Sequence, residues 1–227
     1  MPVPNRDFPK TLSEMIYSYL KEAITSAHIK ANQKIQEKEI ASYFNVSTTP
    51  VREAIKRLAG EGLIKISSHK EAIVKELSYK ELMDIYQAIV CIDEMSAKLA
   101  FSRSLEAVTK EVEEFLSILR KLATKKTISE WLDINEKMYM KISELSGNQF
   151  LYQIRGMISS QLGRYKPLRC FLFSQSNVID DSMRRFELLL KALKSGNLKK
   201  IQSVDLGRWY RLIPSEEEWL AYQHTEE

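Results

Sequence analysis

The segment from Val46 to Ile64 constrains the fold of this 227-residue chain more than any other part of the sequence. Ser47 is a typical N-cap residue, and Pro50 would lie in the first turn of a helix, where its missing N–H costs nothing. The next apolar residues recur at helical spacing and form one stripe for packing: Val51, Ala54, Ile55 and Leu58. The opposite face carries hydroxyls and cations: Thr48, Thr49, Arg52 and Lys56. Such a helix is suited to the major groove of DNA, although an ordinary amphipathic surface helix would show the same periodicity.

The segments on either side of this helix complete a winged helix-turn-helix. Residues 34–45 are expected to form a short helix, which Asn45 would end in a left-handed conformation. Residues 63–67 and 72–75 form two short runs on either side of a turn at residues 68–71, which predicts a β-hairpin. Two short helices joined by a tight turn form a helix-turn-helix, and the hairpin would be its wing.

The stretch from about Ile29 to Leu77 resembles the winged helix of GntR-type bacterial regulators, whose pattern runs roughly V-S-R-T-P-V-R-E-A-L-x-x-L-x-x-E-G-L. The chain matches nearly every position of that pattern. The resemblance implies a DNA-binding head in which Arg52 contacts a base, most simply a guanine through two hydrogen bonds. The candidate DNA-binding residues are Lys38, Ser47, Thr48, Thr49, Arg52, Lys56, His69 and Lys70.

Two departures from the family pattern suggest an altered operator preference. Most members have Arg where this chain has Thr48, and Gly where it has Glu71 in the wing. We therefore expect His69 and Lys70 to reach the minor groove or phosphates from an atypical wing. A third, milder departure is Asn32, which stands where a glycine is common and tolerates the left-handed backbone.

The length of the chain supports two domains with a sizeable core. Ser78 and Glu81 have the spacing of a capping box that would open a new helix, so we place the boundary between residues 1–77 and residues 78–227. The second part shows helical periodicity, and we expect helices over about 79–102, 105–123, 127–146, 149–165, 170–195 and 197–212. The predicted fold is mainly α: a winged helix-turn-helix with a small β-hairpin wing, followed by an all-α bundle.

Two segments of the second part resemble the helical FCD effector domain. Gly147-Asn148 follows Tyr139 as in the family's F-H-x-x-L-x-x-x-x-G-N segment, and residues 189–197 resemble its H-x-x-I-L-x-A-L-x-x-G-D segment. Such domains typically bind a metal through one Asp and three His. The corresponding positions here hold Asn135, Tyr139, Phe186 and Arg208, and the three histidines of the chain lie elsewhere. Because a phenyl ring and a guanidinium cannot replace imidazole ligands, we predict no FCD-type metal and no cofactor.

The interior of the bundle then has two alternative interpretations. The family often places Arg where this chain has Ile89, so the lining becomes more aliphatic and aromatic. Either the pocket has closed into core, or it takes a larger, more apolar effector, with Arg208 able to meet a carboxylate or phosphate. The candidate effector-binding residues are Ile89, Asn135, Tyr139, Phe186 and Arg208.

Composition excludes other classes of function. The net charge is only +4, and the two cysteines form no disulfide framework. No secretory signal is recognisable, and no apolar run approaches the roughly 18 residues that span a bilayer, so we expect a cytoplasmic protein without a membrane partner. No GxSxG, P-loop or GxGxxG motif points to an enzyme.

We therefore predict a homodimeric transcriptional regulator, a repressor by the family's common mode, that binds a pseudo-palindromic operator and a small-molecule effector. A DNA-binding dimer without an effector and an enzyme built on the bundle are the alternatives.

Overall fold

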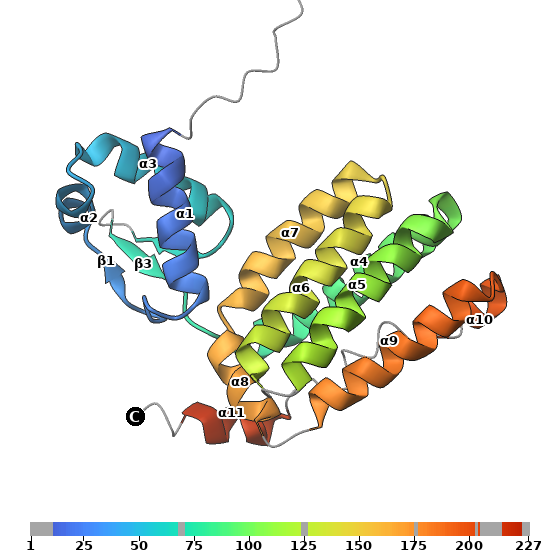
Figure 1. The fold of residues 1–227 in the computed structure, drawn as a ribbon. Helices are drawn as coiled ribbons and strands as arrows, with labels where there is room; N and C mark the ends of the chain where they lie inside the picture. Colours follow the sequence, from blue (N-terminus) through green and yellow to red (C-terminus); the bar gives the residue numbers. More distant parts are fainter. Residues whose placement is uncertain are drawn as a thin grey trace, which may run out of the picture. The chain divides into compact units, whose positions relative to one another are not determined.

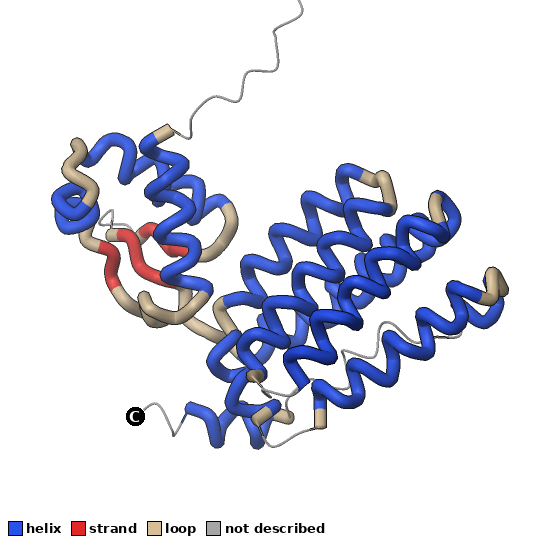
Figure 2. Tube along the Cα trace, viewed as in Figure 1, coloured by secondary structure: helices blue, strands red, loops and turns tan. Residues whose placement is uncertain are grey.

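The computed structural model describes residues 11–67, 71–123, 127–174, 177–202, 204 and 215–223. The chain divides between Leu77 and Ser78 into two compact units. The first unit is small and contains every strand of the described residues, whereas the second is a helical bundle (Figures 1 and 2). Fold class therefore follows the prediction: mainly α, with a winged helix-turn-helix followed by helices.

The first unit packs three helices against a three-stranded antiparallel sheet. The helices are α1 (Leu12–Thr25), α2 (Glu37–Tyr43) and α3 (Thr48–Gly60), and the strands are β1 (Lys34–Ile35), β2 (Ile64–Ile66) and β3 (Ala72–Val74). The strand order is β1-β3-β2, so β3 is central and pairs with both neighbours. The apolar stripe predicted for α3 is buried in the core, where α3 packs on α1.

One boundary in this unit differs from the prediction. Lys34 and Ile35 form strand β1, and the helix begins only at Glu37. Ile35 is buried and lies opposite Ala72 in the sheet, so tertiary pairing with β3 outweighs the local helical pattern. The left-handed turns are as expected, because Asn32 has a φ of 63° and Asn45 a φ of 53°.

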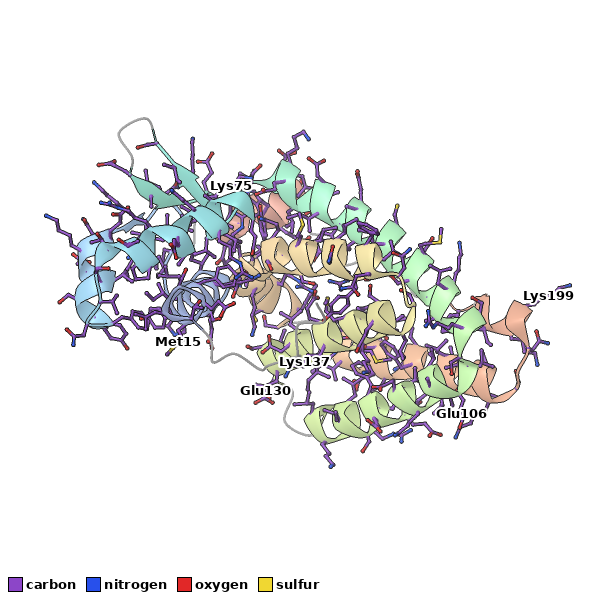
Figure 3. All side chains as sticks on the ribbon, turned by 90° about the horizontal axis from the view of Figure 1, so that it is seen from above. Met15, Lys75, Glu106, Glu130, Lys137 and Lys199 are labelled. Carbon is purple, nitrogen blue, oxygen red and sulfur yellow. The ribbon has the colours of Figure 1, made fainter. Side chains whose placement is uncertain are left out.

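The second unit is a bundle whose central helix is α6, packed against α4, α5, α7 and α8. Helix α5 also packs along α9, and the aromatic and aliphatic side chains between these helices form one core cluster. The helices are α4 (Tyr79–Arg103), α5 (Leu105–Ala123), α6 (Ile128–Leu145), α7 (Gln149–Gly163), α8 (Lys166–Phe173), α9 (Val178–Lys194), α10 (Leu198–Gln202) and α11 (Glu216–Gln223). Charged side chains such as Glu106, Lys137 and Lys199 project from the outer faces (Figure 3).

The helix predicted over 170–195 is wrong in one respect. It is two helices, α8 and α9, and α8 begins at Lys166, before the predicted start, with Pro167 in its first turn. Proline is tolerated there because the first N–H groups of a helix have no intrahelical acceptor. Of the predicted range 197–212, α10 covers 198–202, and most of the rest lies outside the described residues.

Two helix starts in the bundle are fixed by side-chain caps. Gly147 has a φ of 68°, and Asn148 then accepts hydrogen bonds from the N–H groups of Phe150 and Leu151 at 3.1 and 3.2 Å. At the start of α4, Ser78 accepts a hydrogen bond from the Glu81 N–H at 3.4 Å. In a complete capping box the Glu81 carboxylate would accept a hydrogen bond from the Ser78 N–H. Here this N–H donates instead to the hydroxyl of Tyr165, the residue before α8, at 3.1 Å.

Candidate DNA-binding face and interior of the bundle

The front face of α3 is exposed and rich in hydrogen-bond donors. Thr49, Arg52 and Lys56 are exposed, Thr48 is half-buried, and the buried stripe on the other side holds the helix against the core. Ser47 occupies the N-cap position, but its side chain makes no capping hydrogen bond. The hydroxyl is therefore not committed to the helix that it precedes.

The side chain of Arg52 is fixed by a contact that the sequence analysis did not identify. Its Nε donates to Oε2 of Glu37 at 2.7 Å, and 61% of the Arg52 side chain is exposed against 29% for Glu37. Glu37 is the first residue of α2, so this ion pair links the two helices of the helix-turn-helix. Lys38 follows it and is exposed.

Glu71, at the family's glycine position, helps to close the base of the wing. Its N–H donates to Oγ of Ser67, its carbonyl accepts from the Ser67 N–H at 2.9 Å, and its carboxylate pairs with Lys34 on β1. His69 and Lys70 lie outside the described residues.

The structure buries four of the five candidate effector residues. Asn135, Tyr139 and Phe186 lie together in the core between α5, α6 and α9, where the Tyr139 and Phe186 rings are 6.4 Å apart. The amide of Asn135 donates to the Trp131 carbonyl at 2.7 Å and accepts from Ser182 at 3.4 Å. These three positions are therefore buried within the bundle, next to one another. Ile89 is buried on α4, and Arg208 lies outside the described residues.

Beside this core lies a buried ion-pair cluster that the sequence analysis missed. Arg155 on α7 is 1% exposed, and it donates to Asp93 Oδ1 on α4 at 2.6 Å and to Glu136 Oε1 on α6 at 2.5 Å. Asp93 follows Tyr86 and Ile89 on the buried face of α4 at helical spacing. A carboxylate on an otherwise apolar stripe was the signal that could have found the cluster.

The two carboxyls of this cluster respond differently to burial. Burial raises the pKa of Asp93 to about 6, and the nearby Arg155 guanidinium offsets only part of that effect. Burial also acts to raise the pKa of Glu136, but there the Arg155 guanidinium and its hydrogen bond outweigh it, so the pKa lies below its ordinary value. Of the two acids, Asp93 therefore carries the larger unmet cost of desolvation.

Next to these ion pairs lie two buried donors without acceptors. Arg169 on α8 is 6% exposed, and Tyr86 on α4 is 1% exposed. Neither the Nε of Arg169 nor the O–H of Tyr86 has an acceptor among the residues that the structure describes. Burial raises the pKa of Tyr86, whereas the charge of the Arg169 guanidinium and a hydrogen bond from it to the Tyr86 oxygen act to lower it. A ligand oxygen that accepts from both would satisfy two costly groups at once.

Comparison with known proteins identifies the family. Residues 12–74 match the model described as bacterial regulatory proteins, gntR family, and residues 84–204 match the FCD domain. The chain belongs to the GntR regulators that carry an FCD domain. Members of this family are DNA-binding transcriptional regulators rather than enzymes.

Individual relatives are more distant. The Nta operon transcriptional regulator of Aminobacter aminovorans is 26% identical over 60% of this chain and 65% of its own length. The HTH-type transcriptional repressor GlaR of Escherichia coli is 26% identical over 66% of this chain and 70% of its own. The match thus spans about two thirds of these curated relatives. The solved structure of E. coli McbR/YncC superposes with a TM-score of 0.69 at 20% identity, covering 96% of this chain and 99% of that one, which supports the fold.

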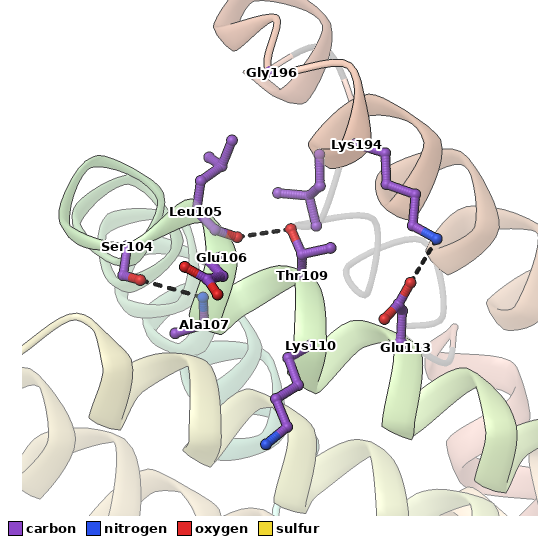
Figure 4. A pocket seen from close by; sticks show the side chains of 10 residues that line it. Ser104, Leu105, Glu106, Ala107, Thr109, Lys110, Glu113, Lys194 and Gly196 are labelled. Atoms are coloured by element: carbon purple, nitrogen blue, oxygen red, sulfur yellow. Dashed lines mark hydrogen bonds and ion pairs between the residues drawn. The ribbon is translucent and has the colours of Figure 1, made fainter.

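A surface hollow of about 790 Å³ lies apart from the candidate residues of this GntR–FCD chain (Figure 4). It is open to solvent between the start of α5 and the end of α9, where Lys194 pairs with Glu113. None of the candidate effector residues lines it. Within the described ranges, no group of three or more His, Cys, Asp or Glu side chains is placed to hold a metal ion, and no helix is long and apolar enough to cross a membrane.

Proposed function

We propose that this protein binds a pseudo-palindromic operator as a homodimer and represses transcription there, in the cytoplasm and without enzymatic activity. The observation that carries the proposal is the exposed donor face of α3, set on a helix whose other face is buried in the core. The name of GlaR as a repressor supports the direction of regulation. The two-fold symmetry of such an operator requires a second copy of the chain. Measuring the mass of the protein in solution would test whether it is a dimer.

In this proposal the DNA contacts are divided between base and backbone. Arg52 donates two hydrogen bonds to a guanine, and Ser47, Thr48 and Thr49 contact phosphates or base edges. The remaining cations orient the head on the backbone or reach the minor groove: Lys38, Lys56, His69 and Lys70.

The test begins with selection of an operator sequence by the wild-type protein. The affinities for this operator and for unrelated DNA are then measured at one salt concentration. Arg52→Ala is expected to lose about 1–3 kcal/mol of binding free energy from the contact with one base pair, so the preference for that base pair should relax. Arg57→Ala is the matched control, because Arg57 belongs to the same helix but its side chain stacks on Tyr17, with Cζ 3.8 Å from the ring centre, and pairs with Glu61. An Arg52→Ala protein with unchanged base preference would remove Arg52 from this role.

We further propose that the effector is anionic with an apolar portion. The unsatisfied donors of Arg169 and Tyr86 support an anionic group, and the buried side chains of Ile89, Tyr139 and Phe186 support an apolar one. Asn135 and Arg208 remain candidate polar contacts of the same ligand. A carboxylate would accept a charge-assisted hydrogen bond from Arg169, which is stronger than a bond between neutral groups.

A thermal unfolding experiment tests this second proposal with defined probes. Sodium hexanoate is expected to raise the melting temperature of the wild type, whereas hexanamide, which lacks the charge, leaves it unchanged. Arg169→Met should abolish the shift, and Arg184→Met, at a 75% exposed position on α9, should retain it. A wild type whose melting temperature does not respond to hexanoate would favour the DNA-binding dimer without an effector.

A further inference from the structure

The ion pair between Glu37 and Arg52 has a bearing on base recognition. Glu37 Oε2 lies 2.7 Å from Nε of Arg52, and this is the contact that holds the Arg52 side chain among the described residues. We propose that Glu37 is a positioning residue for base recognition, which holds Arg52 so that its two terminal Nη groups face the guanine. The inference rests on the proposed role of Arg52.

The chemistry of the guanidinium defines what remains after this contact. Its N–H donors form a planar fork, and a guanine edge presents two acceptors, O6 and N7, to such a fork. Because the carboxylate occupies Nε, the side-on pair formed by Nε and one Nη group is unavailable for a base. The end-on pair of Nη1 and Nη2 stays open, so Glu37 selects one of the two ways in which Arg52 can meet guanine.

The energetics also favour recognition over a role in stability. With the Arg52 side chain 61% exposed, the pair contributes little to the stability of the head. An unrestrained arginine, however, must lose its rotamer freedom when it meets the base, and a preformed contact reduces that loss. The same contact keeps Arg52 from swinging to a nearby phosphate, where it would add affinity without sequence preference. Glu37 is therefore expected to raise the ratio of specific to non-specific binding.

Three variants of the full-length protein test this inference. Glu37→Ala removes the acceptor, Glu37→Gln keeps an oxygen at the same reach without the charge, and Glu39→Ala is the matched control. Glu39 is an exposed acid in the first turn of the same helix, whereas the carboxylate paired with Arg52 is that of Glu37. The affinity of each variant is measured at one salt concentration for three DNAs: the selected operator, the operator changed at the guanine that Arg52 contacts, and unrelated DNA.

Glu37→Ala is expected to lower the discrimination at this guanine about 2- to 10-fold, equivalent to about 0.4–1.4 kcal/mol at 1.4 kcal/mol per tenfold. Glu37→Gln should retain more of the discrimination than Glu37→Ala, and Glu39→Ala should retain all of it. Both alanine variants should bind unrelated DNA somewhat more tightly, because each removes one negative charge from the DNA-facing head. A gain in affinity for unrelated DNA that both alanine variants share is an effect of charge alone. A loss of discrimination that only Glu37→Ala shows is the effect of positioning.

The outcomes also distinguish a failure of the positioning role of Glu37 from a failure of the base contact of Arg52. If Arg52→Ala leaves base preference unchanged, the role of Arg52 fails. If Arg52→Ala relaxes the preference and Glu37→Ala changes it no more than Glu39→Ala does, only the positioning role is overturned. The double variant Glu37→Ala/Arg52→Ala should discriminate no worse than Arg52→Ala alone, because Glu37 acts through Arg52.

Discussion

Asp93→Asn is expected to change how the stability of the protein depends on pH. In the folded chain the pKa of Asp93 is about 6, against an ordinary value of 3.8. Between these values the folded protein holds a proton that the unfolded chain has released, so this residue makes stability fall as the pH rises from 4 to 6. Asn keeps the size of the side chain and cannot ionise, so the variant should lose this component of the pH dependence.

The expected size of the effect follows from the shift in pKa. Each pKa unit corresponds to about 1.4 kcal/mol, so the two-unit displacement of Asp93 amounts to about 3 kcal/mol between pH 4 and pH 7. The free energy of unfolding of Asp93→Asn minus that of the wild type should therefore increase by about this amount over the interval. Glu136 titrates in the opposite sense, but it is present in both proteins and largely cancels in the difference.

Urea unfolding at several pH values, monitored by circular dichroism at one protein concentration, measures the difference in the free energy of unfolding between the two proteins. A constant offset between the two proteins is compatible with the reasoning, since the variant also loses a charge-assisted bond to Arg155. A difference that decreases as the pH rises would refute it. That result would mean that attraction to Arg155 outweighs burial and that the pKa of Asp93 is depressed in the folded protein.

Further variants test the helix ends and the ion pairs, each by urea unfolding at pH 8. Gly147→Ala should cost about 1–2 kcal/mol, because the backbone has a φ of 68° and the new Cβ would meet the side chain of Arg103. Asn148→Ala should cost about 1 kcal/mol through its lost cap, whereas Ser47→Ala, whose hydroxyl caps nothing, should weaken operator binding with little effect on stability. Arg155→Met should cost about 3–5 kcal/mol, because it leaves two carboxylates in the bundle without their cation.

The sequence predicts the DNA-binding head well because its determinants are local. The stripe of Val51 and Leu58 faces the core as helical spacing requires, and Asn45 adopts the left-handed conformation that ends α2. Strand β1 was missed because Ile35 is held by pairing with Ala72, a residue distant in sequence. A two-residue strand has too little length to show a period of its own.

The interior of the bundle could be predicted only in part, because its polar contacts join residues from different helices. Of the four positions that correspond to the family's metal ligands, Asn135, Tyr139 and Phe186 are buried in the bundle, and Arg208 lies outside the described residues. No spacing in the sequence links Asp93 to Arg155, which is 62 residues away, or shows that Arg169 will be buried. Such pairs are defined by how α4, α6, α7 and α8 pack, and that packing is not a local property.

The contrast between the two interiors bears on the proposal that the bundle binds an effector. Every buried polar or charged side chain of the described residues lies in the bundle, and three of them are arginines. Replacing buried ion pairs by apolar residues of similar volume is often neutral or stabilising by about 1–4 kcal/mol, so charges of this kind are weak contributors to stability. A bundle that only joined two heads would gain nothing from Arg169 beside Tyr86 with their donors unsatisfied. Retention of that cost in the absence of ligand is what a binding site requires, since the same donors then contribute to affinity when an acceptor arrives.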